Sequence, residues 1–129
     1  MSTAWILLIP ALIGLLLWWL IMKKRKVISG AVKERLLHQW AAVMDIPDLH
    51  RRVLEGDKIL ESALGTLGFG GTMADKLKKA GPRLPSIDAI WSAHKLRNMI
   101  AHEPGIQITE SDATNALTAF ERALRSLMR

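Results

Sequence analysis

AWILLIPALIGLLLWWLIM, residues 4 to 22, is an unbroken apolar run without a charged side chain. As a helix it would rise about 28 Å, close to the roughly 30 Å of a bilayer's hydrocarbon core. Pro10 and Gly14 fit this interpretation, because transmembrane helices accept both residue types more readily than soluble helices do. The sequence therefore predicts that residues 1–22 form a transmembrane anchor.

A basic cluster directly after this run sets its expected orientation. Lys23, Lys24, Arg25 and Lys26 are interpreted as membrane-surface residues that stay in the cytoplasm and contact lipid headgroups. We therefore expect a single-pass protein of the cell membrane, with its N-terminus outside and its C-terminal domain in the cytoplasm. A cleaved signal peptide is the alternative, but no basic segment precedes the run and no small-x-small cleavage site follows it.

The remainder of the 129-residue chain has room for one modest domain, expected at residues 31–129 after a basic linker at residues 23–30. Lys and Arg number 18 against 12 Asp and Glu, which favours anionic partners, either phospholipid headgroups or nucleic acid. The chain has no cysteine, which excludes disulfides, thiolate metal sites and a cysteine nucleophile.

Apolar residues in this domain recur at three- and four-residue spacing, with no strand-like alternation. Helices are expected at about residues 31–44, 48–67, 86–102 and from 109 onward, with a short helical turn at 72–80. Ser86 and Thr109 are the predicted N-caps of the last two main helices, and Asp112 follows Thr109 at capping-box spacing. The second helix is expected to bury Leu49, Val53, Leu60, Ala63, Leu64 and Leu67.

The glycine-rich segment GFGG, residues 68–71, is interpreted as a helix end and turn. A phosphate-binding loop would need a following lysine-serine or lysine-threonine pair, which is absent. Short connections between helices favour antiparallel neighbours. The predicted fold is therefore all-α: one N-terminal transmembrane helix and a four- to five-helix antiparallel bundle.

Two charged residues fall inside the apolar arcs of their predicted helices. Arg97 lies between the apolar positions of the third main helix, and Asp57 lies beside those of the second. A buried charge without a partner is too costly to keep. The sequence thus predicts an Asp57–Arg97 pair across the bundle, with the alternative that Arg97 extends its charged end to solvent.

His94, Asn98 and His102 follow one another at four-residue spacing, so they form a polar strip beside Arg97. Together these residues offer a proton acceptor, a hydrogen-bond donor and a phosphate-binding guanidinium. His38 and His50 lack such neighbours and are expected on the surface. The arrangement suits neither a metal site nor a serine-histidine-acid set, so no metal or cofactor is expected.

The segment HKLRNMIAHE, residues 94–103, resembles the HEPN family (higher eukaryotes and prokaryotes nucleotide-binding). The family signature is Arg, often followed by Asn, with four to six residues before a His near the end of a helix in a bundle. Here it corresponds to Arg97-Asn98-x-x-x-His102. Active members are metal-independent endoribonucleases that work as dimers with two motifs facing a cleft. The resemblance implies that His102 moves protons at the ribose 2′-hydroxyl or the leaving oxygen, Arg97 holds the scissile phosphate and Asn98 orients the group.

A toxin branch of the family carries a tyrosine two residues after the histidine, where this chain has Pro104, and the chain has no tyrosine at all. Many family members bind without cutting. Three hypotheses follow: a membrane-tethered endoribonuclease using Arg97, Asn98 and His102, with Asp57 and His94 in support; a non-catalytic membrane-anchored module that binds RNA, a nucleotide or a protein; and a structural protein at the lipid surface. The expected partners are the membrane, RNA and a second copy of the chain in a homodimer.

Overall fold

The computed structural model describes residues 4–22 and 26–129, so Lys23, Lys24 and Arg25 of the predicted basic cluster lie outside the described residues. The first helix, α1, spans Ala4–Met22. Its stretch Trp5–Met22 is long and apolar enough to cross a membrane, and none of that stretch is buried against the rest of the protein. The apolar surface of α1 is therefore not part of the bundle's core.

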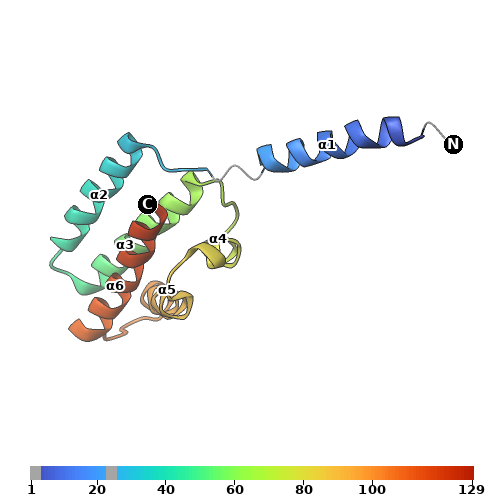
Figure 1. The fold of residues 1–129 in the computed structure, drawn as a ribbon. Coiled ribbons are helices and arrows are strands. Elements are labelled where there is room, and N and C mark those ends of the chain that lie inside the picture. The colour runs from blue at the N-terminus through green and yellow to red at the C-terminus, as the bar shows by residue number, and fades with distance from the viewer. Residues whose placement is uncertain (1–3, 23–25) are drawn as a thin grey trace.

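The described residues after α1 form a bundle of α-helices with one 3-10 turn and no strand, which confirms the all-α prediction. The elements are α2 (Gly30–Met44), α3 (Leu49–Thr66), α4 (Met73–Ala80), η1 (Gly81–Arg83), α5 (Ile87–His102) and α6 (Glu110–Leu127). In Figure 1, α2 runs opposite to α3, whereas α6 runs beside α3 in the same direction and α5 is seen nearly end-on. The antiparallel arrangement expected for sequential neighbours therefore holds for α2 and α3.

Side-chain caps fix where most of these helices begin. Thr109 accepts a hydrogen bond from the backbone N–H of Asp112, whose carboxylate accepts from the N–H of Thr109, so the predicted capping box is confirmed. Ser86 occupies the N-cap position of α5, as predicted, but it does not cap the helix with its side chain. Ser86 has a left-handed backbone, with φ of 48°, and its side chain makes no capping hydrogen bond, because an N-cap side chain reaches the helix only from an extended backbone.

Helix α3 is central and packs against α2, α4, α5 and α6. The largest fully buried side chains come from all five bundle helices: Leu36, Val53, Asp57, Leu60, Leu64, Leu77, Ile90, Phe120 and Leu124. Each buried aliphatic or aromatic side chain contributes about 1.5–3 kcal/mol relative to exposure. The predicted burial on α3 is confirmed at Val53, Leu60, Ala63, Leu64 and Leu67, whereas Leu49 is only partly buried because it stands at the first position of the helix.

Two glycines of the bundle are needed for geometric reasons. A Cβ on Gly56 would lie 2.9 Å from Cδ2 of Leu117, so the absence of a side chain lets α3 approach α6 closely. Gly68 has φ of 90° and follows the end of α3, where the N–H of Phe69 donates to the carbonyl of Leu64 at 3.1 Å. The predicted role of the 68–71 segment as a helix end is confirmed.

Candidate polar site between α3 and α5

The predicted pair between Asp57 of α3 and Arg97 of α5 is present. Nε of Arg97 lies 3.4 Å from Oδ2 of Asp57. The Asp57 side chain is 2% exposed and that of Arg97 is 27% exposed, so the guanidinium lies at the edge of the core. Nε of Arg97 is buried without a hydrogen-bond partner in the described structure. The contact is therefore a charge pair whose geometry is too poor for a hydrogen bond.

His94 and Asn98 close a ring around this pair. Nδ1 of His94 lies 3.0 Å from Oδ1 of Asp57, and Nδ2 of Asn98 lies 3.4 Å from Nε2 of His94. Arg97 donates from Nη1 to Oδ1 of Asn98 at 3.2 Å. One proton arrangement satisfies these contacts: a neutral His94 donates from Nδ1 to an ionised Asp57 and accepts at Nε2 from Asn98. We call Asp57, His94, Arg97 and Asn98 the polar ring.

An open pocket of about 400 Å³ borders the polar ring. Its other lining residues are Glu61 of α3, the α4 N-cap Thr72, and Met73 and Ala74 of α4. Glu61 pairs with Lys76 at 3.1 Å, and Asp57 pairs with Arg97 and His94, so both carboxylates of the pocket have cationic or hydrogen-bonding partners. Nη2 of Arg97 makes no hydrogen bond to any described residue. Beside the pocket, Nη2 of Arg97 is therefore a donor without a hydrogen-bond partner among the described residues, whereas both carboxylates already have partners.

His102 stands apart from the polar ring. It is the last residue of α5, is exposed, does not line the pocket, and makes no hydrogen bond or ion pair within residues 4–22 and 26–129. Five residues on an α-helix turn through about 140° around its axis, so Arg97 and His102 leave α5 on different sides. Of the three predicted catalytic residues, the fold brings Arg97 and Asn98 together and leaves His102 outside.

The remaining histidines differ from each other. His38 is exposed, as predicted. His50 is partly buried, and its Nε2 donates to the carbonyl of Ile106 at 2.8 Å, which ties the start of α3 to the loop between α5 and α6. His50 is at the surface as predicted, with 37% of its side chain exposed, and its hydrogen bond to a backbone group distant in sequence was not predicted. No cluster of three or more His, Asp or Glu suited to a metal ion occurs in the part of the chain that the structure describes.

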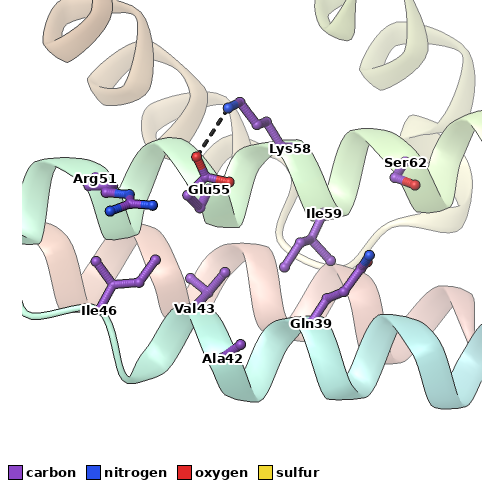
Figure 2. A pocket seen from close by; sticks show the side chains of 9 residues that line it. All are labelled: Gln39, Ala42, Val43, Ile46, Arg51, Glu55, Lys58, Ile59 and Ser62. Carbon is purple, nitrogen blue, oxygen red and sulfur yellow. Dashed lines mark hydrogen bonds and ion pairs between the residues drawn. The ribbon is translucent and has the colours of Figure 1, made fainter.

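A second hollow, of about 510 Å³, lies between α2 and α3 and is shown in Figure 2. Its apolar part comes from Ala42, Val43, Ile46 and Ile59, and its polar rim from Gln39, Arg51, Glu55, Lys58 and Ser62. Glu55 and Lys58 pair at 3.1 Å across one turn of α3. Such an exposed pair contributes little to stability. This hollow contains none of the predicted site residues and brings together no proton-transfer or phosphate-binding set.

Comparisons with family models, with curated proteins and with solved structures give no match to this chain. The polar ring and its pocket are therefore interpreted from their own geometry.

Proposed function

We propose that this chain is a membrane-tethered HEPN-like domain that binds RNA or a nucleotide through the Arg97 pocket without cutting it. The local motif Arg97-Asn98-x-x-x-His102 supports the family relationship, together with its location near the end of a helix in a helical bundle. The apolar helix α1 supports tethering. The basic residues after α1 favour a cytoplasmic domain and an external N-terminus.

The observation that carries the proposal is that Arg97 lines the pocket whereas His102 does not. The guanidinium of Arg97 is positioned by Asp57 and Asn98 and keeps unpaired donors beside an open pocket, an arrangement suited to a phosphate oxygen. General acid-base catalysis requires an imidazole within hydrogen-bond reach of the same substrate. His102 is on another side of α5, so a single copy provides the phosphate-binding group without the proton-transfer group.

The test is binding of a fluorescent single-stranded RNA to the full chain in detergent micelles containing EDTA. We expect salt-sensitive binding and intact RNA. Replacing Arg97 by Gln should weaken binding about tenfold or more, the typical effect of losing a hydrogen bond to a charged group. Lys95→Gln is the matched control, because Lys95 is an exposed charge on the same helix. Equal binding by the two variants, or no binding by the unmodified chain, would contradict the proposal.

A metal-independent endoribonuclease is the second candidate, and the exposed, unpartnered imidazole of His102 favours it. In a homodimer, the His102 of one copy would act on RNA held by the Arg97 of the other. This candidate predicts RNA cleavage in EDTA with a cyclic phosphate on one product end. His102→Ala should abolish cleavage while the helical content stays unchanged. Intact RNA at protein concentrations where the chain is dimeric would eliminate it.

A further inference from the structure

Basic side chains gather at the end of the bundle that receives the anchor. Residues 26–29, which precede α2, are fixed to this end, because Ile28 is 6% exposed and belongs to the core. The Lys26 side chain lies against the end of α3, where its Nζ would be 3.1 Å from a Cβ on Gly68. In Figure 1 the end of α3, the start of α2 and the C-terminus of α6 lie at the same end of the bundle.

Helix α4 adds two lysines to this end. Lys79 donates from Nζ to the carbonyl of Gly70 at 3.3 Å, in the loop that follows α3. Lys78 is exposed beside it. Asp75, one turn earlier, is engaged in the capping box with Thr72. Lys79 therefore contacts the same loop as Lys26, and neither Lys78 nor Lys79 forms an ion pair within the described residues.

Three arginines lie on α6 or just after it. Arg122, Arg125 and Arg129 line a hollow of about 320 Å³ together with Pro85 and Ser126. Arg125 is bonded to Glu121 at 2.9 Å, whereas Arg122 and Arg129 are exposed and make no ion pair within the described residues. Guanidinium groups suit phosphate oxygens, because their planar donors contact two oxygens at once.

The opposite end of the bundle carries five of the twelve acidic residues. These lie at the turn between α2 and α3 and around the loop between α5 and α6: Asp45, Asp48, Glu103, Glu110 and Asp112. Arg51 and Arg52 also lie at that end, whereas Glu34 lies toward the anchor end. We define the anchor-side face as Lys26, Lys78, Lys79, Arg122, Arg125 and Arg129.

We propose that the anchor-side face docks on anionic phospholipid headgroups, so that the bundle rests on the bilayer instead of extending from it. This inference rests on the proposed membrane anchorage. Residues 23–25 separate Met22 from Lys26, so their Cα atoms are at most about 14 Å apart. That limit is less than two Debye lengths of about 8–10 Å at physiological salt, so Lys26, at least, is held where the surface potential of an anionic leaflet still acts. RNA competes for the same charges, but the lipid is held next to the face by the tether.

The chain has no cysteine, so a single introduced cysteine can carry a fluorescent probe. Thr66→Cys places the probe at the exposed end of α3, and Ser111→Cys places it at the exposed start of α6, at the opposite end of the bundle. The full chain is reconstituted into zwitterionic vesicles or into vesicles containing phosphatidylglycerol, each with a headgroup-attached quencher. We expect quenching at position 66 only, only with the anionic lipid, and its loss at about 1 M salt, where the Debye length is about 3 Å.

Replacing Arg122 and Arg129 by Gln should lower the docked-to-undocked ratio about 25-fold, or about fivefold for each charge removed near the surface. Both side chains are exposed, and helical content measured by circular dichroism verifies that the variant folds. The matched control, Arg51→Gln with Lys95→Gln, removes two exposed charges outside the anchor-side face and should leave quenching unchanged.

Two results would overturn the inference, and they are distinguishable. Chain that does not float with vesicles would refute the anchorage, and the docking with it. Chain that floats but shows no quenching at position 66 with anionic lipid, or equal quenching at positions 66 and 111, would refute the docking alone. Protection of the position 66 probe by single-stranded RNA without quenching by anionic vesicles would assign the face to nucleic acid instead. The RNA affinity of Arg97→Gln reports on the proposed function separately.

Discussion

Removing one partner of the polar ring should reveal how strongly Asp57 and Arg97 depend on each other. Leaving one charge of a buried pair without its partner typically costs about 3–5 kcal/mol. Here the cost is expected to be lower, at about 2 kcal/mol. When Asp57 is replaced, water screens the charge of Arg97, which is 27% exposed; when Arg97 is replaced, Asp57 keeps its partner His94 at 3.0 Å. Arg97→Met and Asp57→Asn should each lower the free energy of unfolding by about this amount, which corresponds to roughly 10 °C in Tm for a domain of this size.

The double variant, with Met at 97 and Asn at 57, separates mutual dependence from independent packing. Once both charges are gone, no buried charge remains unpaired, so the total loss should stay near about 2 kcal/mol instead of about 4 kcal/mol. Urea unfolding of the full chain in mild detergent, followed by far-ultraviolet circular dichroism, measures all three variants. Lys95→Met is the control, because it removes an exposed charge from the same helix. Additive losses in the double variant, or single losses no larger than that of the control, would refute the reasoning.

Three further predictions concern the bundle's stability under the same unfolding assay. Gly56→Ala should lower the free energy of unfolding by about 1–3 kcal/mol, because the new methyl group overpacks against α6. Gly65→Ala should raise it by about 0.5–1 kcal/mol, because nothing lies within 4 Å of the new Cβ. Changes of the same sign in both variants would contradict the close approach of α3 to α6. Ser86→Gly should stabilise by about 0.5 kcal/mol, since it relieves a left-handed backbone, and a loss of stability would contradict this. The backbone N–H of Thr72, followed by its hydroxyl, lowers the pKa of Asp75 below its ordinary value. The stability contributed by this carboxylate should therefore be complete above about pH 4 and disappear as the pH falls through the lowered pKa; a deficit of Asp75→Asn that persists in strong acid would contradict it.

Local patterns in the sequence predict most of the fold. The apolar run, the helical periodicity and the capping box at Thr109 determine elements through residues close in sequence, and the observed helix ends agree within about two residues. The Asp57–Arg97 pair was also predictable, because each charge lay on the buried side of its own helix and had to find a partner.

Features that depend on tertiary arrangement were not predictable in the same way. The contact of His94 with Asp57 requires the crossing of α5 over α3, which periodicity does not specify. The hydrogen bond of His50 to Ile106 depends on where the loop after α5 returns to α3. Ser86 has the residue type of an N-cap, but the chain turns there with a left-handed backbone. The separation of Arg97 from His102, by contrast, was predictable from the sequence, because five residues on a helix turn through about 140°.

The burial of Ile28 has a consequence for self-association. Five residues, 23–27, therefore separate the end of α1 from the first core residue in the sequence. With α1 in a bilayer, as proposed, two associating copies would share one orientation, so a two-fold axis relating them would run perpendicular to the membrane plane. Such an axis would place the sides of the two bundles in contact, for example at the hollow between α2 and α3. The two ends of each bundle would lie outside the interface. Before association, two such copies would move relative to each other only by translation in the membrane plane and by rotation about the membrane normal.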